Sequence, residues 1–416
     1  MTTKTTTNRF TASGLTRRSF GALAAGAALV AGIMAGKPAV AQDTIKIGEL
    51  NSYSRFAAFT VPYKQGFELA LEEINAAGGI GGKKLEVISR DDGATTGDAV
   101  RVAEELVTRE NVAFIFGTFL SNVGLAVGDF ANQKKVLFIA AEPLTDALTM
   151  AKGNRYTFRL RANTWMQVGM LVDAVKETGA KRWAIVAPNY EYGQSSAENF
   201  KALAEKAIPG FEVVAEQYPA LGKIDAGATV AALEQAKPDA IFNVLFGGDL
   251  AKFVREGSTR GLFEGRAVAS LLTGEPEWML PLKDEVPAGW IVTGYPWDQI
   301  EDAPHKAFVE AYMAKYDDSP RLGSLLGYQL MYMIRDMLAK AGSTDTEAMI
   351  AALEGLEMDT VAGSVSMRAA DNQSTMGAWV GKLAVEDGKG KMVDWKFYDG
   401  AGFMHTEDAV KAARQD

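Results

Sequence analysis

Apolar and polar residues follow one another along the chain in a pattern that predicts strands and helices in regular alternation. Short apolar runs indicate buried strands, and longer stretches with apolar residues every three or four positions indicate amphipathic helices. In the first half of the chain this pattern predicts strands over residues 45–50, 85–90, 112–116 and 136–140, and helices over residues 63–76, 98–109 and 124–132.

A second series of the same kind begins near residue 183. It predicts strands over residues 183–186, 211–218, 240–246 and 266–271, and helices over residues 195–207, 226–235 and 249–257. Strands that alternate with helices of this length form parallel sheets that are covered on both faces. The sequence therefore predicts an α/β protein with two similar lobes, each built around a parallel sheet.

Ligands of open α/β sheets bind beyond the carboxyl ends of the strands, so the loops after the strands are the candidate binding segments. Aromatic side chains with a few polar groups, as these loops contain, suit a small organic ligand. Any one of these residues could equally be a helix cap or a packing residue. The candidate residues are Phe56, Phe59, Ser121, Asn122, Ala141, Glu142, Tyr190, Tyr192, Phe246 and Asp249.

The first 41 residues have the order of a secretory signal. Arg17 and Arg18 form a twin-arginine pair, an apolar run rich in Ala and Gly covers residues 21–36, and Ala39-Val40-Ala41 is a small-x-small cleavage sequence. We therefore predict export by the twin-arginine route and a periplasmic location. The mature chain would begin near Gln42.

Composition narrows the function further. The predicted signal contains five Lys and Arg residues and no acid, so its removal changes the net charge from −9 to −14, which argues against nucleic-acid partners. The chain has no Cys and only two His, His305 and His405, neither with a metal-ligand spacing. We expect no catalytic residues, cofactor or metal, and no membrane insertion, because no second apolar stretch reaches spanning length.

Several segments carry a resemblance to a known family. They are Lys64-Gln65-Gly66, the run Glu72-Glu73-Ile74-Asn75-Ala76-Ala77-Gly78-Gly79-Ile80, Arg90-Asp91-Asp92, Phe116-Gly117, Tyr192-Gly193 and Lys237-Pro238-Asp239-Ala240. Over residues 43–400 the chain resembles the periplasmic leucine/isoleucine/valine-type solute-binding proteins of ABC transporters.

The resemblance implies two lobes joined by three crossovers, near residues 160, 292 and 370. The N-terminal lobe would comprise residues 43–160 and 293–369, including an apolar helix over 322–338. The C-terminal lobe would comprise residues 161–292 and 370–405, and residues 406–416 would form a tail. Such proteins close around a ligand and present it to an inner-membrane permease.

The resemblance also implies roles for single residues. Ser121 matches the serine that binds a ligand carboxylate, Phe59 or Phe56 the aromatic residue that covers the ligand side chain, and Tyr192 and Phe246 the aromatic residues of the second lobe. The family's acidic residue for a ligand ammonium falls near Leu271-Leu272 instead, and Glu275 could replace it only if the loop shifts. Glu142 or Asp249 could supply the charge, or each could be a helix cap or first-turn acid.

The sequence thus predicts a monomeric periplasmic binding protein of an ABC importer that is not an enzyme. Its ligand would be a small carboxylate, either a branched-chain or related apolar amino acid or an aromatic or aliphatic carboxylate without an ammonium group. An exported α/β hydrolase and a ligand-sensing protein are the alternatives of other classes.

Overall fold

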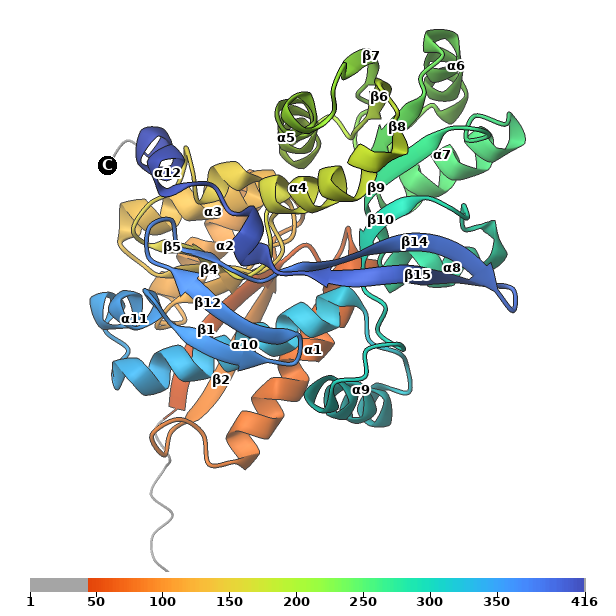
Figure 1. Ribbon diagram of the computed structural model, residues 1–416. Coiled ribbons are helices and arrows are strands. Elements are labelled where there is room, and N and C mark those ends of the chain that lie inside the picture. Colours follow the sequence, from red (N-terminus) through yellow and green to blue (C-terminus); the bar gives the residue numbers. More distant parts are fainter. Residues whose placement is uncertain (1–43, 415–416) are drawn as a thin grey trace, which may run out of the picture. The chain divides into compact units, whose positions relative to one another are not determined.

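The computed structural model describes residues 44–414, so the predicted signal at residues 1–41 lies outside the described residues. Two sheets organise this part of the chain, and helices cover their faces (Figure 1). No helix within residues 44–414 is long and apolar enough to cross a bilayer.

The first sheet has eight strands in the order β11-β12-β13-β5-β4-β3-β1-β2. Its strands are β1 Thr44–Asn51, β2 Lys84–Asp91, β3 Ile115–Gly117, β4 Phe138–Ala140, β5 Thr157–Arg159, β11 Glu357–Thr360, β12 Gly363–Arg368 and β13 Gln373–Ser374. The helices that belong with it are α1 Ala57–Ala76, α2 Thr96–Thr108, α3 Ser121–Lys134, α9 Ala303–Tyr316, α10 Leu322–Ala341 and α11 Thr346–Leu353. We call this sheet and its helices the first lobe.

The second sheet has seven strands in the order β15-β14-β10-β9-β8-β6-β7. Its strands are β6 Arg182–Val186, β7 Glu212–Gln217, β8 Ala240–Asn243, β9 Ala267–Gly274, β10 Ile291–Gly294, β14 Ala378–Glu386 and β15 Lys389–Tyr398. The helices that belong with it are α4 Thr164–Val175, α5 Glu191–Ala207, α6 Ala226–Ala236, α7 Gly247–Thr259 and α8 Pro276–Leu282. We call this sheet and its helices the second lobe.

The predicted fold class, two lobes of α/β architecture, is confirmed, with one refinement. Strands β1 to β5 and β6 to β10 pair in parallel, but one edge of each sheet is antiparallel. The hairpin β11–β12 closes the first sheet, and the hairpin β14–β15 closes the second. The sheets are therefore mostly, and not purely, parallel.

The chain passes between the sheets three times. The passages lie between β5 and α4, between β10 and α9, and between β13 and β14. Strand β13 falls beyond the expected boundary at 370, yet Gln373 pairs with Arg159 of β5 in the first sheet. This short strand is polar, so it carries none of the apolar signal by which strands were predicted.

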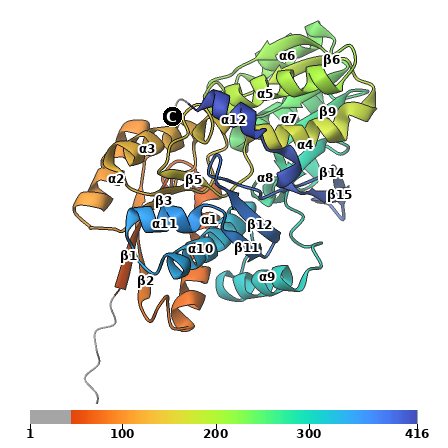
Figure 2. The ribbon, with the colours of Figure 1, turned by 60° about the vertical axis from the view of Figure 1, so that its left-hand side comes forward.

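The segment expected to be a tail is ordered as helix α12, Glu407–Ala413, whose Val410 is buried. The Arg414 guanidinium donates to the carbonyl oxygen of Ala370, and Arg368 donates to that of His405. Both views place α12 beside the first lobe, although β15, which precedes it, belongs to the second sheet (Figures 1 and 2).

Helices α1 and α10 pack unusually close together because both carry glycine at their contact. A Cβ atom at Gly66 would lie 2.0 Å from the carbonyl oxygen of Ser324, and one at Gly327 would lie 2.2 Å from that of Tyr63. This close approach fixes the N-terminal end of α10, which reaches the region between the lobes.

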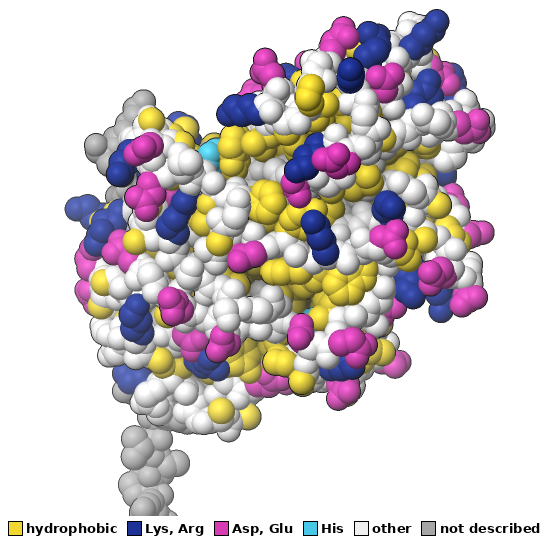
Figure 3. All heavy atoms as spheres, in the orientation of Figure 1, with side chains coloured by type: hydrophobic (Ala, Val, Ile, Leu, Met, Phe, Trp, Pro, Cys, Tyr) yellow, Lys and Arg dark blue, Asp and Glu magenta, His cyan; other side chains and the backbone are white. Residues whose placement is uncertain are grey.

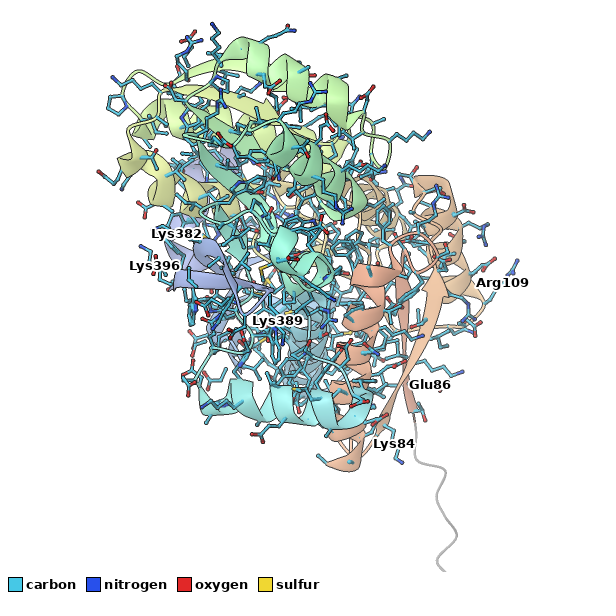
Figure 4. All side chains as sticks on the ribbon, turned by 90° about the vertical axis from the view of Figure 1, so that its right-hand side faces the viewer. Lys84, Glu86, Arg109, Lys382, Lys389 and Lys396 are labelled. Carbon is cyan, nitrogen blue, oxygen red and sulfur yellow. The ribbon has the colours of Figure 1, made fainter. Side chains whose placement is uncertain are left out.

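Charged side chains of both signs are spread over the face in Figure 3, without a large patch of one sign. The charged residues labelled in Figure 4 are exposed, and Lys382, Lys389 and Lys396 extend outward from the hairpin β14–β15. The charges that matter for a ligand are the buried ones described next.

Candidate functional site

A cavity that is partly open to solvent lies where the carboxyl ends of strands from both sheets meet. Both lobes supply its walls, as expected for a ligand site of open α/β sheets. The lining residues are Phe59, Phe119, Ser121, Glu142, Leu144, Arg161, Tyr190, Tyr192, Phe246, Leu272, Glu275, Glu277, Leu322 and Gly323.

One wall of the cavity is aromatic and crosses from lobe to lobe. Phe59 stacks on Phe119 with ring centroids 5.3 Å apart, and it meets Phe246 of the second lobe edge to face at 5.9 Å. Tyr190 and Tyr192 continue the wall at 6.4 and 6.0 Å from Phe246. Such a surface suits an apolar or aromatic ligand body.

Ser121 stands at the start of α3, and its hydroxyl is already used as an acceptor. The backbone N–H groups of Leu144 and Thr145 both donate to Ser121 Oγ at 3.1 Å. The hydroxyl proton is therefore free to donate to a ligand. Helix α3 has no side-chain cap at its N-terminal end, where unsatisfied N–H groups favour an anion.

The opposite wall of the cavity is charged and buried. Arg161 Nη2 donates to Glu275 Oε1 at 2.5 Å, and this ion pair joins the segment after β5 to the end of β9. Glu142 Oε2 accepts from the Asn51 amide at 3.2 Å. Glu277 Oε1 accepts from the backbone N–H of Gly323 at 2.9 Å, which links α8 to α10.

Burial dominates the titration of these carboxyl groups. It raises the pKa of Glu142 to about 8, against the opposing effects of Arg161 and Asn51. Burial also raises the pKa of Glu275, against the opposing Arg161 guanidinium that holds it in an ion pair, and it raises the pKa of Glu277. Carboxylates without full compensation by cations cost free energy when they are buried.

A distortion of β9 places Glu275 in this wall. The pairing of β10 with β9 loses its register between Val292 and Gly294, and Leu272 adopts a φ of 64°. A left-handed leucine costs roughly 1–3 kcal/mol and is held only where the surroundings fix it. Here the Leu272 N–H donates to Thr293 Oγ1 at 2.9 Å, so the shifted loop is anchored.

Five of the residues expected at the site, Phe59, Ser121, Glu142, Tyr192 and Phe246, line the cavity together. Tyr190, which sequence reasoning placed in a loop beyond a strand, lines it too. Phe56 lies behind the aromatic wall, 5.3 Å from Phe119 and 6.2 Å from Phe246 between ring centroids. Asn122 and Ala141 do not line the cavity, although each is next in sequence to a residue that does.

Asp249 does not lie at the cavity, and the prediction that it could face a ligand is corrected. Its carboxylate accepts from the backbone N–H groups of Gly222 at 2.6 Å and Ile224 at 3.3 Å. It is not the N-cap either, because α7 begins at Gly247 and Phe246 occupies the cap position. Asp249 therefore holds the loop before α6.

Sequence reasoning missed Phe119, Arg161, Glu277, Leu322 and Gly323. Arg161 and Glu277 are charged residues just beyond strands β5 and β9, and that position was the available signal. Leu322 and Gly323 enter the cavity only because α10 returns from the far end of the chain. No local pattern could have placed them.

Comparisons with known proteins identify the family of the chain. The family model described as periplasmic binding protein matches residues 44–390. A Leu/Ile/Val-binding protein homolog 7 from Brucella suis is 28% identical, covering 81% of this chain and 87% of its own. A leucine-, isoleucine-, valine-, threonine- and alanine-binding protein from Pseudomonas aeruginosa is 26% identical, covering 78% and 86%.

Solved structures show the same fold. A Rhodopseudomonas palustris solute-binding protein in complex with 3,4-dihydroxybenzoic acid is 23% identical with a TM-score of 0.77, covering 86% of this chain and 98% of its own. A leucine-, isoleucine-, valine-, threonine- and alanine-binding protein from Brucella ovis, in a closed conformation, is 20% identical with a TM-score of 0.78, covering 88% and 97%.

Proposed function

Because the chain belongs to the periplasmic binding protein family, we propose that it captures a small solute in the cavity between its lobes and delivers it to an inner-membrane ABC permease. The observation that carries this proposal is the cavity itself, with its aromatic wall from both lobes and its buried charged wall. A site that joins two lobes fits capture by lobe movement. The protein would act without catalysis and as a monomer.

For the solute we propose a small molecule with a carboxylate and an apolar body. The Ser121 hydroxyl and the free N–H groups at the start of α3 would bind the carboxylate. Phe59, Tyr192 and Phe246 would enclose the body, with Phe56 supporting them from behind. Branched-chain or related apolar amino acids are the first candidates, in line with the names of the sequence relatives.

Aromatic carboxylates without an ammonium group are the second candidates. The aromatic wall favours them, and one structural neighbour holds 3,4-dihydroxybenzoic acid while another holds 4-hydroxybenzoate. The two candidates differ in whether the ligand needs a negative partner in the protein.

A thermal-shift screen of the purified mature protein against amino acids and benzoates tests the proposal, with calorimetry on each hit. A ligand at a hundredfold excess over Kd stabilises the folded protein by about 2.7 kcal/mol. Phe246→Ala should weaken binding, whereas Phe397→Ala on the exposed face of β15 should not. A panel without any stabilising compound, or hydrolysis of generic esters and amides by the protein, would argue against the proposal.

We also propose that the precursor uses the twin-arginine route to the periplasm. The support is the order of the first 41 residues, with Arg17 and Arg18 before the apolar run. Replacing both arginines by lysine should leave precursor in the cytoplasm, while Arg9→Lys serves as the matched control. Normal periplasmic yield of the double variant would indicate the general secretory route.

A further inference from the structure

The charged wall of the cavity has more negative groups than positive ones. Arg161 is its cation, and Arg161 is engaged by Glu275. Within residues 44–414, no ion pair joins Glu142 or Glu277 to a lysine or arginine side chain. Two carboxyl groups of the wall are thus left without a cationic partner from the protein.

Two buried polar atoms at the cavity also lack hydrogen-bond partners among the described residues. They are Glu277 Oε2 and the Tyr192 hydroxyl oxygen. The side chains are 8% and 2% exposed, and both line the cavity. Buried polar atoms are normally paired, so unpaired ones that face a cavity indicate groups that a ligand satisfies.

The geometry points to a solute with a cationic nitrogen between Glu142 and Glu277 and a net positive charge, such as a basic amino acid. This inference rests on the proposed function and, for the same site, favours a cationic solute over the apolar amino acids and aromatic carboxylates named there. A carboxylate of the solute would take the Ser121 end, and its apolar part would lie along the aromatic wall. The solute would then carry more cationic nitrogens than carboxylates, and its positive charge would offset part of the negative charge of the two unpaired acids.

Protonation explains how Glu142 and Glu277 can stay buried when no cationic solute is bound. Burial raises the pKa of Glu142 and of Glu277, so protons can neutralise them when no cation is bound. The other ionisable groups that interact with this pair include Glu49, Glu275, Arg161, Arg321, Tyr63 and Tyr295. A cationic nitrogen would replace the protons, and binding would release them to solvent.

Two matched series of compounds test the inference by calorimetry on the mature protein. The aliphatic series is lysine, norleucine and hexanoate, and the aromatic series is 4-(aminomethyl)phenylalanine, 4-methylphenylalanine and 3-(4-methylphenyl)propionate. Each series keeps the body and removes one charged nitrogen per step. In the series that fits the cavity, we expect the cationic member to bind most tightly and the anion most weakly, with steps on the order of tenfold to a hundredfold.

Repeating the titrations in phosphate and in Tris measures the protons exchanged, because the two buffers differ in ionisation enthalpy. The cationic compound should release protons on binding. Glu277→Gln should weaken binding of the cationic compound by on the order of tenfold or more and reduce its proton release. The amide keeps an oxygen for the Gly323 N–H, and Glu347→Gln, at an exposed ion pair with Arg155, is the matched control.

The outcomes separate this inference from the proposed function. If the zwitterion or the anion binds as tightly as the cation, or if no cationic compound binds, the inference is wrong. The thermal-shift screen of amino acids and benzoates then remains the test of the proposed function. If Glu277→Gln unfolds, the proton release and the two compound series measured on the unsubstituted protein still test the inference.

Discussion

Removal of the Ser121 hydroxyl should weaken the fold as well as the site. Ser121 Oγ accepts from two buried backbone N–H groups, those of Leu144 and Thr145. In Ser121→Ala both donors lose their acceptor, and each unsatisfied buried donor costs about 1–3 kcal/mol. We expect the free energy of unfolding of the ligand-free protein to fall by about 2–6 kcal/mol.

Urea unfolding followed by circular dichroism measures this loss. Ser196→Ala is the matched control, because Ser196 is also buried but its hydroxyl only donates to the carbonyl oxygen of Tyr192 one helical turn earlier. That carbonyl keeps its helical position and partner, so the control should lose less than about 1 kcal/mol. If Ser121→Ala unfolds with a free energy within about 0.5 kcal/mol of the wild type, the assignment of the two bonds is refuted.

Four further predictions follow from single contacts. Gly327→Ala should lower the free energy of unfolding by about 1–3 kcal/mol because its Cβ would collide with Tyr63, whereas Gly97→Ala, with open space around it, should not destabilise. Glu275→Gln should cost about 3–5 kcal/mol in thermal or urea unfolding by leaving Arg161 unpaired, and adding Arg161→Met should restore part of the loss. Asp249→Ala should destabilise by about 1–3 kcal/mol through the Gly222 and Ile224 N–H groups yet leave solute affinity unchanged in calorimetry; a loss of affinity would return Asp249 to the site. Burial lowers the pKa of His305 to about 4, below the ordinary value near 6.5, so its contribution is fully present above pH 6.5 and is lost as the pH falls toward 4; between pH 6.5 and 4.5 the free energy of unfolding of the wild type should fall by roughly 2 kcal/mol relative to that of His305→Gln, a difference that cancels the buried carboxyl groups common to both proteins.

The sequence predicted the elements with strong periodicity and missed those without it. Helix α10 was expected over 322–338 and spans Leu322–Ala341, because its apolar positions are dense. The helices α3, α5 and α7 all begin earlier than expected, at Ser121, Glu191 and Gly247. Their first turns face the cavity, so polar and small residues replace the apolar pattern there.

The site was predictable where one loop supplies a residue and not where two segments must meet. Phe59, Ser121 and Tyr192 lie in the segments that follow β1, β3 and β6, and that position in the sequence made them candidates. Glu275 reaches the cavity through the left-handed Leu272, a backbone conformation that no side-chain pattern encodes. The pairing of Arg161 with Glu275 joins segments that follow strands of two different sheets, so no local sequence pattern predicts it.

Because β15 belongs to the second sheet and α12 lies beside the first lobe, the chain passes between the lobes a fourth time at its C-terminal end. Residues 399–406 leave the second sheet, and His405 stacks on Trp165 of α4 while its ring lies 3.3 Å from the Asp146 carboxylate of the first lobe. Any rotation of one lobe against the other must lengthen this short span or break these contacts. We expect this span to limit how far the lobes can open, although it lies outside the cavity lining. A chain shortened to end at residue 404 should therefore exchange solute faster, although every residue that lines the cavity is retained.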